Sequence, residues 1–321
     1  MAETLYKSAT GCTNIEDIQV DTSHSSQVST AIVRTKDTSL DIGDSIEITI
    51  GYVGNTNKVF SGYVKQKEHA ESGTGRIYTL TCSDVLIRAQ DFFIASSDPN
   101  SPFTRSNIAA EDLVEDVLAL ASLTNYTSDA TSFTFAVHNP LTVNLTSSYD
   151  YCRFISDILA WHIYADENGL VHFVDRRPYV MGGDTSEFTI TASQILDVKR
   201  TVTDRNLRNR VVVYGNGDVH ATAQASSPYL PAGFYKSVVV SAPTVFDTQE
   251  MAQAAADRNL TILNRLTESV NATVVGNPDL LARKIITMNR SSIDISGTWY
   301  VFAAAHALGR AGYTTTIELR K

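Results

Sequence analysis

Residues 296–321 read SGTWYVFAAAHALGRAGYTTTIELRK, and this stretch has the pattern of a closing β-hairpin. An apolar run is followed by a short turn bounded by glycines, and then by a strand in which apolar and polar residues alternate. His306 is the single histidine of the apolar run. In an alternating strand it shares a face with Ala304 and Leu308, so we expect it to be a packed, structural residue and not a catalytic one.

The first hundred residues have the same two-residue period. In GDSIEITIGY, residues 43–52, three isoleucines alternate with polar side chains, which is typical of a half-buried strand. The next segment, KVFSGYVKQKEH at 58–69, is interrupted by Gly62, as a bulge or a barrel corner would be. A glycine-rich turn and another strand follow at 71–82. Strands at this spacing predict a small barrel or sandwich.

The period changes to that of helices near Ser106. The pattern predicts one helix capped by Ser106, and a second helix that begins at Ser147 with Asp150 in its first turn. Two alternating strands follow around the turn at 167–169. We therefore expect a small α+β domain over residues 104–182.

The β pattern returns after residue 183. A hairpin is predicted around the turn at 215–217, and four further strands close the chain. A helix is predicted between them, at about 249–266, with Asp247 and Glu250 as a capping pair at its start. The order along the chain is thus β, then α+β, then β.

The composition fits a globular chain of two or three domains. Among the 321 residues no apolar run approaches the ~18 that a membrane span needs, and the N-terminus lacks the pattern of a secretory signal. The net charge of -9 argues against a surface that grips nucleic acid, because phosphate contacts need clustered Lys and Arg. Cys12, Cys82 and Cys152 share no CxxC spacing, which favours a reducing compartment over a disulfide scaffold or a zinc site.

Three groups of residues are candidates for chemistry. His162 and His172 flank one predicted hairpin, and ordinary hairpin pairing is expected, with a metal or catalytic pair as the alternative. In EDLVED, Glu111 lies one helical turn from Glu115, and Asp112 one turn from Asp116. These carboxylates are expected on a solvated helix face, with a general acid–base pair as the alternative.

The third group is DRRPY, residues 175–179, which is the one local cluster of basic residues. An ion pair within the loop, made with Asp175, is expected there. The alternative is a site that binds a partner's carboxylates or phosphates. The sequence contains no HExxH, GxSxG, Walker A or GxGxxG motif, so no catalytic, cofactor-binding or metal-binding residue is predicted.

The C-terminal stretch also resembles a protein family. GNPDL at 276–280 precedes a strand, GTWYV at 297–301 precedes His306, and GYTT at 312–315 opens the last strand. These motifs resemble the ending of the baseplate hub proteins of contractile phage tails, the late control protein D group, which is related to the hub part of type VI secretion spikes. Gly43-Asp44 and the segment VFSGYV at 59–64 resemble the first barrel of that family. The sequence departs from it at Ala282-Arg283, where many relatives have a Pro-Gly step before the strand.

The resemblance implies a mainly β fold with an α+β insert. It implies two tail-tube-like β-barrel domains, at residues 1–103 and 183–321, with the small α+β domain at 104–182 between them. The helix at about 249–266 is then expected inside the second barrel domain.

The resemblance also implies a structural role without enzymatic activity or a cofactor. The chain would form a homotrimeric ring in the virion tail baseplate, made in the host cytoplasm, that joins the sixfold tail tube to the threefold central spike and surrounds the DNA channel. The implied partners are other copies of itself, the tail tube protein, the central spike protein, the tape-measure protein and other baseplate proteins. Genomic DNA is a partner only in transit, and no small-molecule substrate is implied.

Two other functions are compatible with the residues. One is a cell-wall glycan hydrolase of the tail tip that uses acidic residues of the central domain, and the other is a different β-rich tail component or a carbohydrate-binding adhesin. For the hub, we expect an acidic or neutral channel wall, because fixed positive charge would retain passing DNA. We also expect the strands at 45–52 and 313–320 to pair between subunits, because exposed strand edges need partners.

Overall fold

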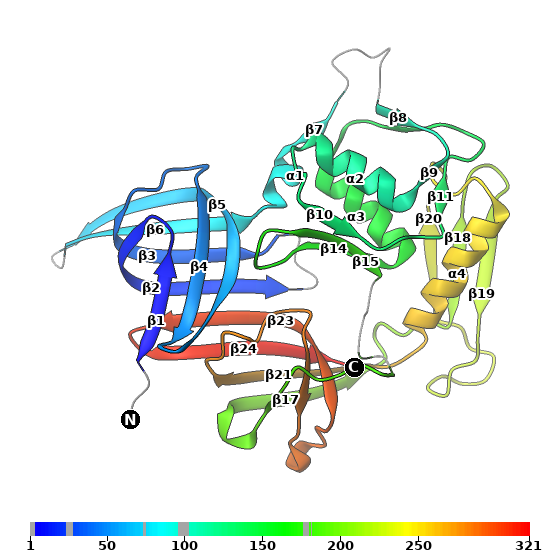
Figure 1. Ribbon diagram of the computed structural model, residues 1–321. Helices are drawn as coiled ribbons and strands as arrows, with labels where there is room; N and C mark the ends of the chain where they lie inside the picture. Colours follow the sequence, from blue (N-terminus) through cyan, green and yellow to red (C-terminus); the bar gives the residue numbers. More distant parts are fainter. Residues whose placement is uncertain (1–3, 24–27, 73–74, 96–102, 176–179, 181) are drawn as a thin grey trace.

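The computed structural model describes residues 4–23, 28–72, 75–95, 103–175, 180 and 182–321. Within these ranges the chain is mostly β-strand, with four α-helices gathered on one side of the molecule (Figure 1). The prediction of a mainly β fold with an α+β insert is confirmed. No helix in the described ranges combines the length and the apolar character needed to cross a membrane.

Six strands near the N-terminus form the first barrel. They are β1 Leu5–Ala9, β2 Cys12–Ser23, β3 Thr30–Thr38, β4 Ser45–Tyr52, β5 Asn55–Ser72 and β6 Gly75–Asp84. Their order in the sheet is β1-β4-β5-β6-β3-β2, and every neighbouring pair is antiparallel. Alternate side chains such as Ile18, Val20 and Ile48 fill the core, because successive residues of a strand point to opposite faces.

Gly62 lies where β5 crosses closest to β6. A Cβ atom at this position would meet the carbonyl oxygen of Ser83 at 2.1 Å, so only glycine allows the two backbones to approach this closely. Register shifts flank the glycine, one in β4 after Ile48 and one in β5 after Val64. The expected corner in this strand is therefore present.

Six later strands form the second barrel. They are β16 Phe188–Ile190, β17 Ile195–Thr203, β21 Thr267–Val275, β22 Ile285–Met288, β23 Thr298–Gly309 and β24 Gly312–Arg320, with short 3-10 helices at Ala192–Gln194 and Ser291–Ile293. Their order is β16-β22-β23-β24-β21-β17, and only the β16–β22 pair is parallel. The core includes Trp299, Ile317 and Val270.

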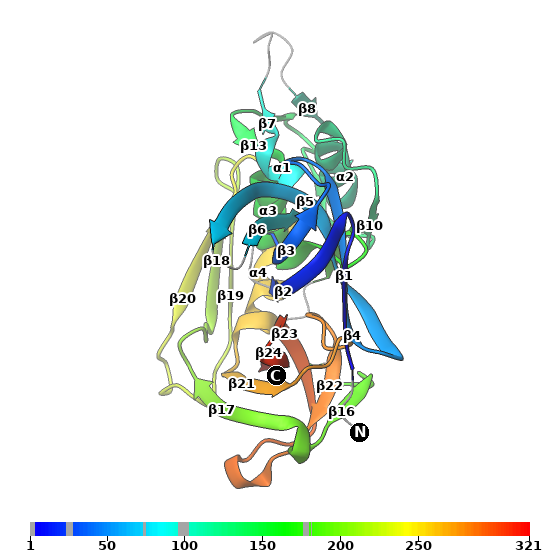
Figure 2. The same ribbon diagram turned by 90° about the vertical axis from the view of Figure 1, so that its left-hand side faces the viewer.

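The two barrels are joined through one strand pair. Strand β2 of the first barrel pairs antiparallel with β23 of the second, so a single layer of eight strands runs from β5 through β2 and β23 to β17. Figure 2 shows this layer as a curved sheet, with β5 near one end and β17 at the other.

The two strands expected to pair between subunits are interior strands of this sheet. Strand β4 lies between β1 and β5, and β24 lies between β21 and β23. The prediction for 45–52 and 313–320 is therefore wrong, because both edges of each strand are already paired within the chain. An alternating pattern reveals a half-buried strand, but it does not reveal which neighbours flank it.

The segment between the barrels contains three helices and short strands. These elements are α1 Ile87–Asp91, β7 Phe93–Ile94, β8 Phe103–Arg105, β9 Ile108–Ala109, α2 Ala110–Leu120, β10 Tyr126–Ser128, β11 Thr134–Phe135, β12 Leu141–Val143, β13 Thr146–Ser147, α3 Ser148–Leu159, β14 Trp161–Ala165 and β15 Val171–Asp175. Strands β14 and β15 form the predicted hairpin. The apolar stripes of α2 and α3 pack into one core, which includes Leu113, Val117 and Ile155.

The helix starts differ in part from the sequence prediction. The hydroxyl of Ser147 accepts the backbone N–H of Asp150 at 3.0 Å, so this predicted cap is confirmed. Helix α2, for which Ser106 was the predicted cap, begins three residues later, after Ala109. Residues 108–109 form strand β9, which pairs with β11 before the helix starts.

A further unit lies between β17 and β21. It consists of β18 Arg210–Tyr214, β19 His220–Gln224, β20 Ser237–Ser241 and α4 Gln249–Leu263. Strands β18 and β19 form the predicted hairpin. Helix α4 is capped by the hydroxyl of Thr248, which accepts the N–H of Met251, while Asp247 binds the backbone N–H of His138 instead.

Helix α4 packs with the central segment and not with the second barrel. Its buried residues Ala252, Ala255 and Ala256 belong to the same core as α2 and α3. Small side chains let the helix lie close to β18 and β19, and Figure 1 shows it there, away from β21 and β24. The sequence analysis expected this helix inside the second barrel domain, but the structure places it outside that barrel. The division of the chain at residues 104 and 183 stays a prediction.

Candidate functional site

The two hairpin histidines both lie against Tyr164. The rings of His162 and His172 each stack with the ring of Tyr164, at centroid distances of 5.0 and 4.7 Å. His172 Nε2 lies 3.1 Å from a carboxylate oxygen of Asp166. Burial alone would raise the pKa of Asp166, but hydrogen bonds from His172 and from the backbone N–H groups of Leu170 and Asn168 outweigh it and lower that pKa. The described residues contain no group of three His, Cys, Asp or Glu side chains placed to hold a metal ion.

The carboxylates of α2 hold neighbouring segments in place. Glu111 accepts the backbone N–H of Thr131 at 3.1 Å, and Glu115 accepts the hydroxyl of Ser128 at 2.7 Å. Asp116 binds the guanidinium of Arg105 at 2.6 Å, and Asp112 is exposed. These carboxylates point to different partners, so the helix does not present two of them to a common reacting group.

Only the first residue of the basic cluster DRRPY lies within the described residues. The other four, at 176–179, lie outside them. The carboxylate of Asp175 accepts a hydrogen bond from the guanidinium of Arg258 on α4, and the same guanidinium donates to the carbonyl of Leu159 at 2.7 Å. Asp175 therefore links β15 to α4, while the ion pair predicted within the loop lies outside the described residues.

His306 is buried at the junction of the barrels. It is 2% exposed, and the hydroxyl oxygens of Tyr313 and Thr315 lie 2.9 and 3.2 Å from its Nδ1 atom. Burial lowers the pKa of His306 to about 4, so the ring is neutral at pH 7. Enclosed between β2 and β24, it has no access to a substrate, and its position is that of a packed strand residue.

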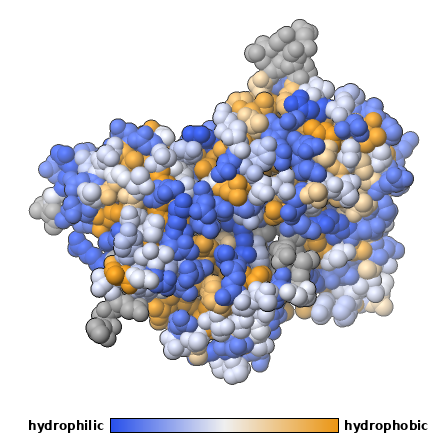
Figure 3. Space-filling model, viewed as in Figure 1, coloured by the Kyte–Doolittle hydropathy of each residue, from blue (hydrophilic) through white to orange (hydrophobic). Residues whose placement is uncertain are grey.

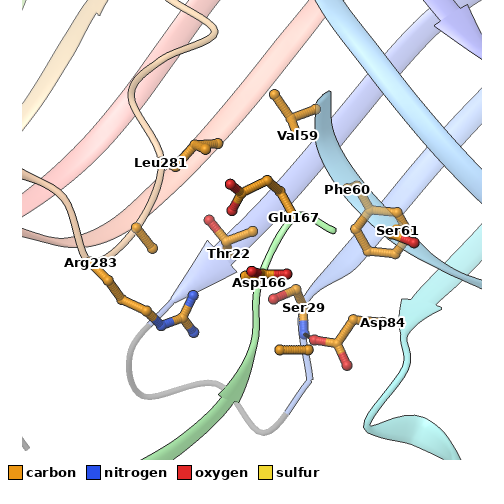
Figure 4. A pocket seen from close by; sticks show the side chains of 12 residues that line it. Thr22, Ser29, Val59, Phe60, Ser61, Asp84, Asp166, Glu167, Leu281 and Arg283 are labelled. Atoms are coloured by element: carbon orange, nitrogen blue, oxygen red, sulfur yellow. Dashed lines mark hydrogen bonds between the residues drawn. The ribbon is translucent and has the colours of Figure 1, made fainter. Parts of the chain in front are cut away.

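A cluster of polar side chains occupies the meeting point of the first barrel, the β14–β15 hairpin and the turn before β22. Figure 4 shows Arg283 reaching from that turn toward Asp84 and Asp166. Asp84 is 3% exposed, and its carboxylate accepts the backbone N–H groups of Ser29 at 2.6 Å and of Leu86 at 2.9 Å. Burial raises its pKa to about 6, although both hydrogen bonds and the charge of Arg283 oppose this rise.

Arg283 holds an unusual backbone conformation. Its φ of +76° lies in the left-handed region that favours glycine, and this is the position at which the sequence departs from the Pro-Gly step of the resembled family. Its guanidinium lies 3.9 Å from the ring of Tyr164 and donates to the carbonyl of Ser23 at 3.4 Å. Burial lowers its pKa, but an arginine stays charged at neutral pH. The side chain thus compensates for a strained turn by tying three parts of the chain together.

The cavity inside this cluster is too small for an organic ligand. Its volume is about 20 Å³, which is room for a single water molecule. Substrate-binding pockets are usually more than ten times larger. We therefore interpret the cluster around Arg283 and Asp84 as a structural junction. Sequence analysis noted Arg283 only as a departure from the family pattern and did not mention Asp84, so neither residue was predicted to form a polar junction.

The open face of the eight-stranded layer is an extended surface of the described residues. Side chains on this face alternate with the buried ones, and most are short and polar. From β3, β6, β24 and β21 they include Thr30, Thr79, Thr81, Ser83, Thr314, Thr316, Asn271 and Thr273, and β23 contributes Ala303, Ala305 and Ala307. One hollow of about 380 Å³ lies on this face beside the β23–β24 turn, where Asp17, Ala307 and Thr314 are among its lining residues.

The charged side chains on this open face are more often acidic than basic. Arg34 forms an ion pair with Asp17 at 3.3 Å, and Arg320 forms one with Glu318 at 2.7 Å, so both arginines are neutralised locally. Further charged residues on the face include Asp21, Glu68, Asp197 and Lys199. On the side of the molecule seen in Figure 3, apolar residues lie in scattered groups among polar ones.

Comparison with known proteins identifies the fold. No protein-family model matches the sequence, and no curated protein matches it. The tail protein from Neisseria meningitidis MC58 is similar in structure, with a TM-score of 0.72 and 12% identity, over 99% of this chain and 97% of that one. The 43 kDa tail protein of prophage MuSo2 from Shewanella oneidensis has a TM-score of 0.68 and 11% identity, over 99% of this chain and 98% of that one.

A third similar structure comes from a secretion system. The E. coli c3393 protein, a component of the type VI secretion system that exhibits structural similarity to the T4 bacteriophage tail proteins gp27 and gp5, has a TM-score of 0.62 and 8% identity. The match covers 98% of this chain and 76% of that one. The chain therefore has the fold shared by these phage tail proteins and this secretion component. The predicted resemblance to baseplate hub proteins is confirmed at the level of the fold.

Proposed function

We propose that this protein is the structural hub of a phage or phage-like contractile tail, located in the virion baseplate. In this role three copies form a ring that joins the sixfold tail tube to the threefold central spike. The tube protein, the spike protein, the tape-measure protein and other baseplate proteins are its partners, and DNA passes through the ring.

The observation that carries this proposal is the pair of six-stranded barrels joined into one sheet. Three chains with two barrels each present six barrels to a sixfold tube and three chains to a threefold spike. The similar structures of tail proteins support the same role, because their match extends over nearly the whole of both chains. We further propose residues 1–103 and 183–321 as the barrel-bearing parts, with the unit at 204–264 packed onto the central segment.

The open face of the eight-stranded layer is the proposed channel wall. Its side chains are mostly short and polar, and Arg34 and Arg320 are neutralised by neighbouring carboxylates. A duplex that passes such a wall finds few cations to hold its phosphates. We expect the purified protein to show no salt-dependent binding of duplex DNA in gel-shift assays, and salt-sensitive binding would contradict the assignment of this face.

The proposed role is structural and not enzymatic. The α2 carboxylates bind backbone and hydroxyl groups of neighbouring segments, and the hairpin histidines stack on Tyr164. A cell-wall glycan hydrolase is the competing function, and a zymogram on peptidoglycan separates the two. A cleared band from the purified protein, lost in a Glu115→Gln variant, would favour the hydrolase.

Electron microscopy of the purified protein and of the assembled particle tests the hub directly. We expect a threefold ring with a central hole and a sixfold outline from the barrels. Twofold, fivefold or sixfold copies of this chain around the tail axis would overturn the proposal.

A further inference from the structure

The second barrel repeats the first, strand for strand. In chain order, β1 to β6 correspond to β16, β17, β21, β22, β23 and β24, and corresponding strands hold the same places in the sheet order. The unit made of β18, β19, β20 and α4 is inserted between the counterparts of β2 and β3. The two barrels therefore share one topology, although the β16–β22 pair is parallel and its counterpart is antiparallel.

Register shifts fix which residues correspond. In β5 the residue skipped by the pairing with β6 is Lys65, and in β23 the residue skipped by the pairing with β24 is Phe302. In β2 the skipped residue is Glu16, and in β17 it is Leu196. These matching irregularities align the two barrels residue by residue in the strands that matter for their junction.

The junction within the chain shows how two such barrels join. Strand β2 pairs with the second half of β23, so that Val20 lies opposite His306 and Asp21 lies opposite Ala305. The first half of β23 pairs with β22 instead. A barrel thus offers the outer edge of its β2-type strand to the protruding half of the neighbour's β5-type strand.

Each of these edges recurs once more in the chain, where no described strand covers it. The counterpart of β2 is β17, which pairs with β21 on one side only. The counterpart of β23 is β5, which pairs with β4 only as far as Tyr63. Within the described ranges, residues 66–71 of β5 therefore have one unpaired edge, like the outer edge of β17.

We propose that the outer edge of β17 pairs antiparallel with residues 66–71 of β5 in a second copy of this chain, and so repeats the β2–β23 junction between subunits. Transfer of the internal register places Arg200 opposite the neighbour's His69, and Thr201 opposite its Glu68. This inference rests on the proposed function, because it names the contact by which copies of the hub would form their ring. It continues the curved layer of Figure 2 from one copy into the next.

The side chains along these edges suit that contact. Lys199 would lie diagonally across the strand pair from Glu68 on the open face, at a spacing that long side chains can bridge. Leu196 and Val202 of β17, which are 58% and 47% exposed, lie in the region that a second strand would approach. The contact is heterologous, since two different edges meet, and repetition of a heterologous contact forms a ring when the rotation between neighbouring copies closes.

Disulfide trapping tests the contact and its register. The variant Thr201→Cys/Glu68→Cys places one thiol on each edge, and its matched control Asp21→Cys/Ala305→Cys places thiols at the corresponding internal pair. After copper-phenanthroline oxidation at high protein concentration, we expect a linkage within one chain for the control. For the test variant we expect covalent dimers and trimers on a non-reducing gel, at least tenfold above either single variant. A pair shifted by two residues, Thr201→Cys/Ala70→Cys, should link several-fold more slowly.

The outcomes separate this contact from the proposed function. A ladder that ends at three supports both, and a ladder that closes at another number supports the contact but overturns the threefold hub. A threefold ring in electron micrographs without linkage of the Thr201/Glu68 pair overturns the contact alone. Equal linkage by Thr201→Cys by itself would also overturn it, because two copies of β17 would then be pairing with each other.

Discussion

The two barrels share their strand order and register shifts, yet their protruding strands differ in chemistry. Residues 303–308 of β23, which β2 covers within the chain, read AAAHAL, whereas the corresponding residues 66–71 of β5 read QKEHAE. A histidine occupies the same place in both. His306 is 2% exposed, while His69 is exposed and stacks on Tyr78 at a centroid distance of 4.4 Å.

This difference separates a permanent contact from a conditional one. A junction formed within one chain is always covered, so small apolar residues can line it without risk. An edge that stays open until assembly would attract any unpaired strand if it were apolar, and charged residues along it discourage such pairing. The charged character of residues 66–71 therefore fits an edge that must remain soluble first and pair later.

The largest effect is expected where the covered junction is disturbed. Val20 of β2 is 1% exposed and lies opposite His306, so Val20→Asp places an unpaired carboxylate in the core. We expect the free energy of unfolding to fall by about 4 kcal/mol. Chemical denaturation followed by circular dichroism measures the loss.

The corresponding residue of the open edge supplies the control. Arg200 of β17 forms an ion pair with Glu268 at 2.7 Å and is partly exposed. Arg200→Asp should cost only about 1 kcal/mol, because exposed ion pairs contribute little. Equal losses of unfolding free energy for Val20→Asp and Arg200→Asp would contradict the comparison. The covered edge of β2 and the open edge of β17 would then not differ as the register indicates.

The second effect concerns the turn that brings β22 and β23 to the junction. Arg283→Ala keeps the strained backbone at φ +76° and removes the contacts with Tyr164 and Ser23, so we expect a loss of about 2 kcal/mol. Arg283→Gly loses the same contacts but relieves the strain, so it should be about 1 kcal/mol more stable than the alanine variant. Thermal and chemical denaturation of both variants measures the difference. If glycine were the worse substitution, the side-chain contacts and not the backbone would dominate the turn.

Strands of both barrels were predicted correctly from the two-residue period of the sequence. Alternation in 43–52 and 313–320 identifies β4 and β24, and Gly62 marks the corner that it was expected to mark. Periodicity reports the environment of a strand's two faces and is silent about its edges. For this reason the edge positions of β17 and β5 could not be found without the sheet order, and the two strands chosen for subunit contacts are interior ones.

The placement of α4 shows a second limit. Its alanine-rich face is equally suited to either barrel or to the central segment, so its apolar pattern does not predict which of them it packs against. Asp84 illustrates the same limit for the polar junction, because its two backbone partners come from residues 29 and 86, and burial of the carboxylate depends on three separate segments. Local sequence predicts elements, while contacts among distant segments decide which polar residues become buried.

The third effect uses pH to test the buried histidine of the covered junction. The pKa of His306 in the folded protein is about 4, below the value near 6.5 of the unfolded chain. The folded protein then binds fewer protons than the unfolded chain between these values, so stability falls as the pH decreases. From pH 7 to pH 5 this histidine should account for a loss of about 2 kcal/mol.

Comparison with His306→Gln isolates that contribution. The variant disturbs the hydrogen bonds with Tyr313 and Thr315 and should lose about 1 kcal/mol at pH 7, but it should equal or exceed the wild type at pH 5. Asp84, whose raised pKa of about 6 acts in the opposite direction, is the same in both proteins and cancels in the difference. A constant difference between His306→Gln and the wild type would show that the ring does not titrate in this way.

The smallest effect on stability, and the most direct test of the comparison, comes from giving the open edge the chemistry of the covered one. Glu68→Ala with Glu71→Leu copies Ala305 and Leu308 into the corresponding positions of β5. Both glutamates are exposed, so the free energy of unfolding should change by less than about 0.5 kcal/mol. Removal of the charges should instead promote strand pairing, which sedimentation velocity would detect as oligomers or aggregates at protein concentrations where the wild type is still dispersed. Asp112→Ala on α2, an equally exposed carboxylate remote from both edges, should leave the sedimentation profile unchanged. If the β5 variant sediments like the wild type, the charges on that edge do not prevent strand pairing. The difference in composition between β5 and β23 must then have another cause.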